Sequence, residues 1–434
     1  MREASVHTPA LGRGGRAAIA LLAGIVALTL LPGAADAAEK GKKKGQVVKV
    51  MTRNLYLGAD LGPALSAPSQ QAFIEANGQI LRQVDATNFP VRAKALASEI
   101  KQRDPDLVGM QEVALWRTGP FDLNPPVTGI PVASDVKYDF LQLLLTELNS
   151  GKCAKPKGKG KGKGKGKSAK SKASCDRYRV AIAKNEFDFE APADYDGNPA
   201  TGVFGGEING RLTMRDVILV RDGAGVKVSK PISGTFPTLL RVNVSGLNVN
   251  VTRGWTALDA RVRGSEQFRF VNLHHEAFDS SPSNGTNQGT TVGQGEVREA
   301  QAKSLVAPGG PANTKLPVIL LGDLNSDDDT VGNDGDVLAY NALVAAGLRP
   351  VDTSNPLSCC LSDPNLVGGS LADFDHHIDH VMTDSKAIRF RRGFITGRAP
   401  VSGLWPSDHN GVTSELTVPR KPNQGKQKGK GKKR

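Results

Sequence analysis

Apolar and polar positions along the chain follow two periods, and the pattern predicts strands interspersed with helices. Helices are expected at 90–102, 139–149, 296–306 and 337–346. Apolar or alternating runs predict strands at 47–54, 107–113, 177–183, 212–220, 225–228, 247–251, 267–273, 318–321, 378–382 and 411–416. Helices among many hairpin-like strands favour an α/β fold with a mixed sheet.

One predicted strand, 318–321, ends in Gly322-Asp323-Leu324-Asn325. A buried strand that presents a carboxylate and a carboxamide at its carboxyl end is a common way for an α/β protein to build a site. Similar polar residues lie within or beside other strand-like segments: Asn54, Glu112, His274, Asp379, Asp408 and His409. Oxygen ligands of this kind bind Mg²⁺ or Mn²⁺, and histidines move protons or bind phosphoryl oxygens. Each residue alone would read as an ordinary polar side chain, but the set suits metal-assisted phosphoryl chemistry.

The first 37 residues have the pattern of a secretory signal peptide. Arg2, Arg13 and Arg16 precede an apolar run at 17–31, and Ala35-Asp36-Ala37 supplies a small-residue cleavage site. A membrane anchor is the alternative, but the run is shorter than the ~20 residues that span a bilayer. We therefore expect an extracellular protein, and no later segment predicts a transmembrane helix.

The net charge of +13 is concentrated in three low-complexity segments. Lysines at 40–44, ten lysines between 152 and 172, and eight Lys or Arg from 420 to 434 leave the rest of the chain with a net charge near −9. Lys-Gly repeats cannot form a core, so we expect solvated arms that attract polyanions without reading sequence. Such arms are equally compatible with nucleic-acid tethering and with a simpler role in solubility or in adhesion to an anionic envelope.

The composition predicts one domain with basic extensions: a signal peptide at 1–37, a basic linker at 38–45, a catalytic domain at 46–419 with a Lys/Gly-rich insertion at about 152–173, and a basic tail at 420–434. Four cysteines in a secreted chain suggest disulfides. We favour Cys153–Cys175 across the base of the insertion, whereas Cys359 and Cys360 could form a vicinal bridge or remain thiols. The Cys/His spacing matches no zinc-ligand pattern. The oligomeric state is not predicted.

Six motifs together resemble the endonuclease/exonuclease/phosphatase superfamily, which includes pancreatic-type deoxyribonuclease and abasic-site endonucleases. The matching segments occur in the family's order: Thr52-Arg53-Asn54, Met110-Gln111-Glu112-Val113, Val271-Asn272-Leu273-His274, Gly322-Asp323-Leu324-Asn325, Ile378-Asp379-His380-Val381 and Ser407-Asp408-His409. The resemblance covers nearly the whole predicted domain.

The resemblance implies a four-layered α/β sandwich, in which two mixed sheets are flanked by helices and the site lies at one rim. It implies that Glu112, with Asn54 and Asp408, holds a divalent cation, Mg²⁺ or Mn²⁺, that polarises a phosphoryl oxygen. Asp323 would orient or deprotonate the attacking water, and Asn325 would hydrogen-bond the phosphate.

The same resemblance assigns roles to two histidines and an arginine. His409, braced by Asp379, would be a general base or phosphate ligand, and His274 would protonate the leaving oxygen or stabilise charge. Which histidine is acid and which is base stays open. Arg215 resembles an arginine that contacts phosphate, although Arg211 competes for this role and an ordinary ion pair is equally compatible.

Several residues depart from the family pattern. Tyr178 and Glu186 are available for a tyrosine and a second acid that the family often carries, but no clear motif surrounds them. His275 and the pair His376-His377 could extend the site, although we interpret them as ordinary histidines. An acidic loop could take a structural Ca²⁺, but we favour a solvated loop; its residues are Asp327, Asp328, Asp329, Asp334 and Asp336.

Substrate choice rests on the arms. We expect a nuclease acting on DNA or RNA, because polycationic arms would raise the local concentration of polyanion around an acidic body. A sphingomyelinase-like or phospholipase C-like enzyme and a phosphomonoesterase are alternatives within the superfamily. A noncatalytic binder of anionic surfaces is disfavoured, because it would not need the Glu, Asp and His set.

Overall fold

The computed structural model describes residues 45–151, 177–223, 225–278, 295–328, 337–352 and 357–421. The predicted signal peptide, the insertion with Cys153 and Cys175, and nearly all of the basic linker and tail lie outside these residues. The described residues all belong to one compact unit that begins at residue 44.

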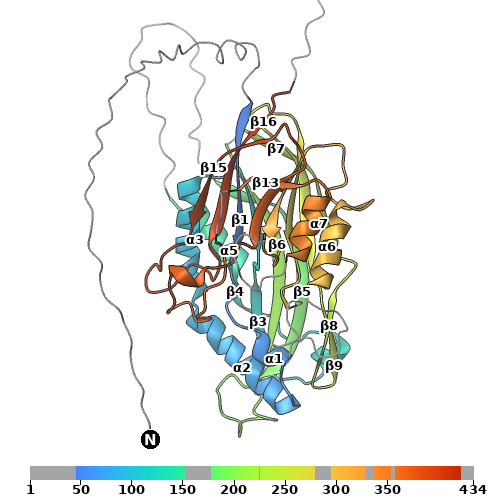
Figure 1. Cartoon of the computed structure of the whole chain (residues 1–434). Coiled ribbons are helices and arrows are strands. Elements are labelled where there is room, and N and C mark those ends of the chain that lie inside the picture. Colours follow the sequence, from blue (N-terminus) through green and yellow to red (C-terminus); the bar gives the residue numbers. More distant parts are fainter. Residues whose placement is uncertain are drawn as a thin grey trace, which may run out of the picture. The chain divides into compact units, whose positions relative to one another are not determined.

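Two large mixed sheets form the centre of this unit (Figure 1). The first has eight strands in the order β15-β16-β1-β2-β6-β3-β4, with β5 paired to β6, and the second has six in the order β13-β14-β12-β11-β10-β7. A separate hairpin consists of β8 and β9. The strands are β1 (Gln46–Asn54), β2 (Leu107–Gln111), β3 (Leu115–Pro120), β4 (Asp135–Asp139), β5 (Tyr178–Ala193), β6 (Ile208–Arg221), β7 (Val226–Thr235), β8 (Leu240–Val244), β9 (Leu247–Val251), β10 (Gly254–Val262), β11 (Phe268–His274), β12 (Val318–Asp323), β13 (Arg349–Pro350), β14 (Asp379–Thr383), β15 (Arg389–Thr396) and β16 (Gly411–Val418).

Helices cover the outer face of each sheet. The helices are α1 (Gly62–Leu65), α2 (Gln70–Ala86), α3 (Phe89–Arg103), α4 (Pro125–Thr128), α5 (Phe140–Asn149), α6 (Glu296–Val306), α7 (Leu338–Ala345) and a short 3₁₀ turn at Leu371–Asp373. Leu96 of α3 and Leu144 of α5 share a core with Val108 and Leu219 of the first sheet. On the other side, α6 and α7 pack on β11 and β12. The layers therefore run helix, sheet, sheet, helix, and the predicted four-layered α/β sandwich is confirmed.

The inner faces of the two sheets form a separate apolar layer that includes Val50, Ile218, Phe270 and Ile319. The sheets approach each other closely at Gly109, where a Cβ atom would lie 2.4 Å from Asn272 Oδ1. Only glycine fits so close a contact without displacing the partner.

Beside that contact, buried amides link the two sheets. Gln111 Nε2 donates to Asn272 Oδ1 at 2.6 Å, and Thr52 Oγ1 donates to Gln111 Oε1 at 3.3 Å. The glutamine of the Gln-Glu motif is thus a structural residue that joins the sheets directly below the predicted site.

The structure adds elements that the pattern did not predict. Helix α2 contains Gly78 at a position where a Cβ would collide with the carbonyl oxygen of Asp194, so the glycine reflects close packing and not a helix end. Strand β5 is much longer than the predicted 177–183, and β3, β4, β8, β10 and β15 were not predicted. Among the described residues, no helix is long and apolar enough to cross a bilayer.

Candidate active site

The topology brings the predicted site residues to one rim. Neighbouring β1 and β2 are parallel, and so are β11 and β12, so their carboxyl ends point the same way within each sheet. Strands β14 and β16 run antiparallel to β12 and β1 and therefore begin at that rim. The site residues that meet there are Asn54, Glu112, His274, Asp323, Asp379, Asp408 and His409.

Three pairs of side chains cross from one sheet to the other. Asn54 Nδ2 donates to Asp323 Oδ2 at 2.9 Å. His409 Nδ1 lies 2.8 Å from Asp379 Oδ2, and His274 Nε2 lies 3.9 Å from Glu112 Oε1. In each pair, one residue lies in or next to a strand of the eight-stranded sheet, and its partner belongs to the six-stranded sheet. The residues of the eight-stranded sheet are Asn54, His409 and Glu112.

Asp323 lies between the two histidines. Its Oδ2 is 3.6 Å from His274 Nε2 and 3.8 Å from His409 Nε2. The side chain is buried, and its second oxygen, Oδ1, accepts the N–H of Asn325 at 2.9 Å. A carboxylate held in this way is positioned to orient or deprotonate a small molecule between the two rings.

The backbone around Asp323 explains why the sequence reads Gly-Asp-Leu-Asn. Gly322 has φ +151°, and a Cβ there would lie 2.1 Å from the carbonyl oxygen of Leu273, so only glycine is accommodated. Asn325 adopts a left-handed conformation at φ 47°, which asparagine tolerates better than most residues. Its Nδ2 donates to the carbonyl oxygen of His275 at 3.1 Å, and its predicted phosphate contact remains a prediction.

The environments of the two histidines act in opposite directions on their pKa values. Burial by itself lowers the pKa of His409, but Asp379, Asp408 and Asp323 outweigh it and raise that pKa well above its usual value. Burial lowers the pKa of His274 well below its usual value, and Arg253 adds to the effect, with Nη1 3.1 Å from His274 Nδ1. Since arginine has only donors, it cannot stabilise a protonated ring beside it.

The acidic residues of the rim fit an oxygen-liganded cation. Burial raises the pKa of Asp408 to about 6, and the nearby Glu112 adds to the rise. Burial likewise raises the pKa of Asp323 to about 6. Crowded carboxylates of this kind are stabilised in their ionised form by a divalent cation. Glu112 and Asp408 are the candidates for ligands.

Asn54, the third predicted ligand, is held by other contacts. Its Oδ1 accepts the N–H of Tyr56 at 2.9 Å, and its Nδ2 donates to Asp323. Its role as a metal ligand remains a prediction. In the structure, Asn54 connects the end of β1 to Asp323.

The two candidate phosphate-binding arginines point to other partners. Arg215 donates to the carbonyl oxygens of Val113 and Ala114 at 2.8 and 3.1 Å, and its Nη2 lies 2.6 Å from Asp139 Oδ1. Arg211 forms an ion pair with Asp188. The phosphate contact of Arg215 stays a prediction, and its observed contacts instead hold the turn that follows Glu112.

Arg92 is a site-supporting residue that the pattern did not reveal. It is almost fully buried, and it donates to the carbonyl oxygens of Leu55 at 2.6 Å and Pro406 at 3.1 Å. One guanidinium therefore joins the segment after Asn54 to the segment before Asp408. No pattern in the sequence marks this arginine, because its partners are backbone atoms.

A second buried acidic pair lies near His274. Asp216 is fully buried, neither of its carboxylate oxygens has a hydrogen-bond partner, and burial followed by Glu186 raises its pKa well above the usual range. Burial raises the pKa of Glu186 to about 7. Glu186 lies against Gly254, the strand partner of His274, whereas Tyr178 donates its hydroxyl to the carbonyl oxygen of Pro105, near the start of β2.

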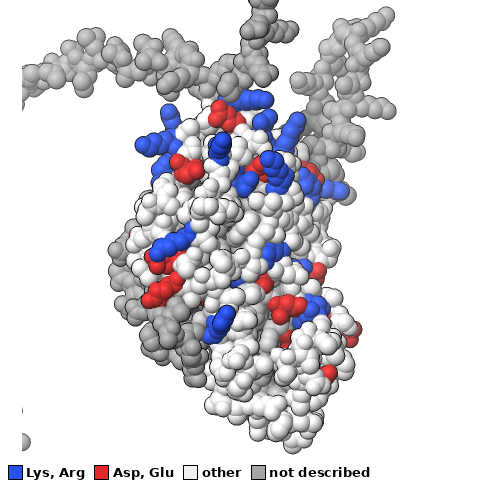
Figure 2. Space-filling view, turned by 90° about the vertical axis from the view of Figure 1, so that its right-hand side faces the viewer, with Lys and Arg blue, Asp and Glu red and all other residues white. Residues whose placement is uncertain are grey.

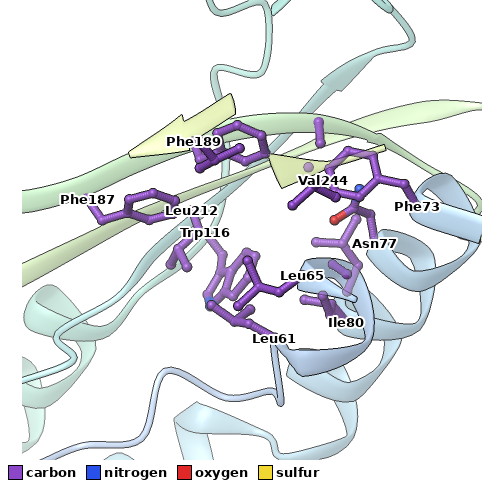
Figure 3. A pocket seen from close by; sticks show the side chains of 15 residues that line it. Leu61, Leu65, Phe73, Asn77, Ile80, Trp116, Phe187, Phe189, Leu212 and Val244 are labelled. Carbon is purple, nitrogen blue, oxygen red and sulfur yellow. The ribbon is translucent and has the colours of Figure 1, made fainter. Parts of the chain in front are cut away.

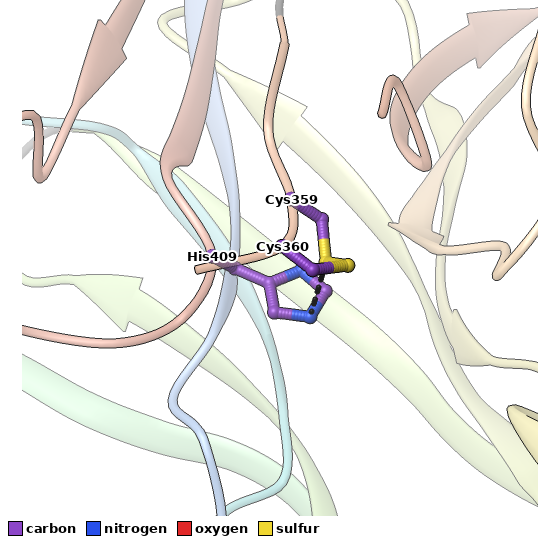
Figure 4. Close-up of side chains that lie close together, drawn as sticks. All are labelled: Cys359, Cys360 and His409. Carbon is purple, nitrogen blue, oxygen red and sulfur yellow. Dashed lines mark hydrogen bonds between the residues drawn. A yellow bond between two sulfur atoms is a disulfide. The ribbon is translucent and has the colours of Figure 1, made fainter. Parts of the chain in front are cut away.

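The structure joins Cys359 and Cys360 by a disulfide, which settles the alternative left open by the sequence (Figure 4). Cys359 Sγ lies 3.4 Å from His409 Nε2. The N–H of Leu361 donates to the carbonyl oxygen of Asp408 at 3.0 Å. This segment therefore forms one wall of the site beside the terminal histidine.

An apolar pocket of about 80 Å³ lies between helices α1 and α2 and strands β3, β5, β6, β8 and β9. Trp116 lines it, and its indole N–H donates to the carbonyl oxygen of Leu57 at 2.8 Å, while the N–H of Leu57 donates to Glu112 Oε2 at 2.7 Å. Leu65 and Ile80 from the helices face Phe189 and Val244 from the strands (Figure 3). This pocket was not predicted from the sequence.

The remaining histidines among the described residues are buried or paired. His275 is fully buried, and burial lowers its pKa to about 3. Asp327 and Asp328 of the predicted acidic loop contact His376 and His377. The other three acids of that loop lie outside the described residues, so the Ca²⁺ prediction stays a prediction.

Carboxylates and histidines from two sheets therefore converge at one rim of a four-layered sandwich, where they form the candidate active site. The chain belongs to the endonuclease/exonuclease/phosphatase family, whose model matches residues 76–409. Members of this family are metal-dependent phosphoesterases, so the predicted reaction class is confirmed at that level.

Solved structures with a similar chain path have low sequence identity to this chain. An endonuclease/exonuclease/phosphatase family protein from Bacteroides thetaiotaomicron is 16% identical, with 87% of this chain and 99% of that chain covered and a TM-score of 0.46. A mannosyl-6-phosphatase from the same organism is 16% identical, with 86% and 100% covered and a TM-score of 0.43. TDP2 from D. rerio, complexed with a single-strand DNA product, is 15% identical, with 86% and 100% covered and a TM-score of 0.41. No curated protein matches the sequence.

Proposed function

We propose that this protein is a secreted, divalent-metal-dependent phosphodiesterase that hydrolyses nucleic acid by in-line attack of water. The observation that carries the chemistry is Asp323, buried between His274 and His409 at 3.6 and 3.8 Å. Secretion is supported by the signal-like sequence at 1–37.

Each side chain has a role that its contacts support. Asp323 orients the attacking water and takes its proton, since its pKa of about 6 suits a base near neutral pH. His409, whose Nδ1 faces Asp379, carries a proton and binds or protonates a phosphoryl or leaving oxygen through Nε2. His274, kept neutral beside Arg253, offers a hydrogen bond to developing charge.

The acids of the rim supply the cation site of this proposal. Glu112 and Asp408, which are close enough to influence each other's charge, would hold the ion together with Asn54, and the oxygen chemistry of the carboxylates suits Mg²⁺ or Mn²⁺. When bound, such a cation polarises a non-bridging phosphoryl oxygen and offsets the charge that develops on it.

The described residues next to the basic segments in sequence lie at the end of the body opposite the site. The described chain begins beside the end of β16, where Gln46 pairs with Val418, and β5 begins with Tyr178 paired to Arg221. Arg221 Nη2 lies 2.9 Å from Asp106 Oδ1, just before the start of β2. The site lies at the other end of β1, whose nine residues span roughly 26 Å.

Several exposed cations of the folded body lie at the same end as these attachment points. Figure 2 shows Lys and Arg gathered toward the upper end of the face in view. Lys227 of β7 and Arg389 and Arg391 of β15 are exposed. Basic arms and basic strands at this end would hold a long polyanion while another part of the polymer reaches the site, which favours polymeric substrates over small ones.

An activity panel tests the proposal. Purified mature protein is assayed on plasmid DNA, RNA, sphingomyelin and bis(4-nitrophenyl) phosphate, with and without EDTA. We expect DNA or RNA cleavage that EDTA abolishes and that Asp323→Ala and His409→Ala reduce at least a hundredfold. If both variants retain every activity, the catalytic assignment is wrong.

Separate deletions of 155–172 and 422–434 test the arms. We expect weaker and less salt-dependent binding to long DNA, with unchanged turnover of the small diester. Equal binding of plasmid DNA by the full chain and both deletion variants at low salt would contradict the tethering role.

The pocket beside Trp116 favours a second candidate, a phospholipase C-like or sphingomyelinase-like activity. Its lining is almost entirely apolar, and it is linked to Glu112 through Leu57. An alkyl chain in the pocket would place an attached phosphodiester near the rim. Sphingomyelin cleavage that Leu65→Arg abolishes, with DNA cleavage unchanged, would favour this candidate over the nuclease.

A further inference from the structure

A second cluster of potential metal ligands lies on the far side of β14 from the catalytic rim. Asp352 follows β13, His377 precedes β14, and His380 is the second residue of that strand. One ligand atom from each of these three residues lies within 4.8 Å of the others, and all three residues are buried. Side chains alternate along a strand, so His380 points away from the His409 partner Asp379. Its ring packs on Tyr340 of α7 at a centroid distance of 4.9 Å.

The hydrogen bonds of the two histidines leave one ring nitrogen of each without a partner. His377 Nδ1 lies 2.8 Å from Asp328 Oδ2, and His380 Nε2 lies 3.0 Å from the carbonyl oxygen of Ser326. The opposite nitrogens, His377 Nε2 and His380 Nδ1, are buried and have no hydrogen-bond partner. Histidines that bind a metal characteristically donate their other N–H to a carboxylate or a backbone carbonyl.

The carboxylate of Asp352 completes this set. Its Oδ2 accepts the N–H of Val381 at 2.9 Å and lies 3.7 Å from His377 Nε2, which is too far for a hydrogen bond. A buried polar nitrogen without a partner costs free energy, and two such nitrogens in one cluster need a common explanation.

A proton alone does not satisfy the cluster. A proton on His377 Nε2 would face Asp352 Oδ2 at 3.7 Å, beyond hydrogen-bond distance. It would also leave the buried His380 Nδ1 without a hydrogen-bond partner. A single cation among the three residues would satisfy both free nitrogens and the carboxylate.

We propose that Asp352, His377 and His380 bind one transition-metal ion of the Zn²⁺ type. Two imidazole nitrogens and one carboxylate oxygen are ligands that Zn²⁺ accepts, whereas Mg²⁺ and Ca²⁺ prefer oxygen. The absence of a zinc-type Cys/His spacing in the sequence does not argue against this site, because its ligands come from two separate segments.

The ion would fasten three pieces of chain that meet next to the catalytic residues. His380 and His377 flank Asp379, and their second nitrogens contact Ser326 and Asp328, directly after the segment that carries Asp323. The ion would act as a structural clamp beneath the rim and would be distinct from the catalytic cation.

Zinc binding by the full chain without a histidine tag tests the proposal. The protein is stripped with chelator, returned to millimolar Mg²⁺ to occupy oxygen-only sites, kept free of reductant so that Cys359–Cys360 stays closed, and titrated with Zn²⁺ against a chromogenic chelator. We expect one tight Zn²⁺ per chain, also in a Glu112→Gln background that weakens the catalytic site. Asp352→Asn and His380→Gln should each weaken binding at least tenfold.

His376→Gln is the matched control. His376 is adjacent to the cluster, but its Nδ1 lies 3.2 Å from Asp327 Oδ2, so zinc binding should be unchanged. Thermal unfolding of each variant, with and without Zn²⁺, separates lost binding from lost folding, because only chains with the intact cluster should be stabilised by the ion. No tight Zn²⁺ in the wild-type chain, or an equal loss in His376→Gln, would overturn the proposal.

Discussion

Replacing Asp379 with asparagine isolates the charge that supports the terminal histidine. Asp379 is fully buried, and its Oδ2 lies 2.8 Å from His409 Nδ1. Asparagine has nearly the same shape and keeps a carbonyl oxygen that can accept the Nδ1–H, so the geometry should survive while the negative charge is lost. A hydrogen bond to a charged group contributes about 1.5–3 kcal/mol, which corresponds to roughly a 10- to 160-fold fall in kcat if the interaction is fully used in the transition state.

The pH dependence gives a second measurement of the same substitution. The pKa of His409 is raised in the folded chain above its unfolded value near 6.5, so its charge stabilises the fold below that value, and this stability is lost as pH rises through the folded pKa. Without Asp379 the folded pKa should fall, so the loss of stability and the basic limb of activity should both move to lower pH.

The assay is steady-state hydrolysis of bis(4-nitrophenyl) phosphate from pH 5 to 10, with urea unfolding measured in parallel. Asp222→Asn is the control, because it makes the same chemical change in an exposed ion pair with Arg179. A loss of kcat below threefold, together with an unchanged pH profile, would refute the role assigned to Asp379.

Three further predictions concern the cation, the sheet contact and the buried arginine. Because the pKa values of Asp323 and Asp408 are raised to about 6, these carboxylates lower the stability of the fold as pH rises from 4 to 6. Mg²⁺ should therefore raise the Tm strongly at pH 7.5, where both are ionised, and hardly at pH 5. An equal effect at both pH values would contradict the cation site. Gly109→Ala would bring a Cβ within 2.3 Å of Leu321 Cδ1 and should lower the free energy of unfolding by about 1–3 kcal/mol in urea titrations, whereas no change would show that the sheets can separate. Arg92→Met releases two segments of the site, so the loss of kcat, expressed as a free energy of activation, should exceed the loss in free energy of unfolding. An unchanged kcat would contradict the supporting role of Arg92.

Strand ends with polar candidate site residues could be predicted from the sequence, because an apolar run indicates both the strand and the position where it ends. Val318–Asp323 is the clearest case, and the family motifs placed His274 and His409 at the same rim. Elements with a mixed pattern were missed for physical reasons. Strand β15 carries Arg389 and Arg391 on an exposed edge and therefore has no apolar run.

The supporting residues could not be predicted, because their partners are distant in sequence. Arg253 precedes β10 and meets His274 only because Gly254 pairs with His274 across the sheet. The cluster of Asp352, His377 and His380 depends on which face of β14 each side chain takes and on the path of two loops. Neither feature leaves a periodic signal in the chain.

Because side chains of the candidate site contact each other across the two sheets, the geometry of the site depends on the relative position of the sheets. Asn54 with Asp323 at 2.9 Å and His409 with Asp379 at 2.8 Å each span the seam between the layers. A rigid-body shift of one layer by a single ångström would break both contacts at once. Heat or a core substitution that loosens the seam should therefore abolish catalysis while both layers remain folded, so loss of turnover should precede loss of secondary structure.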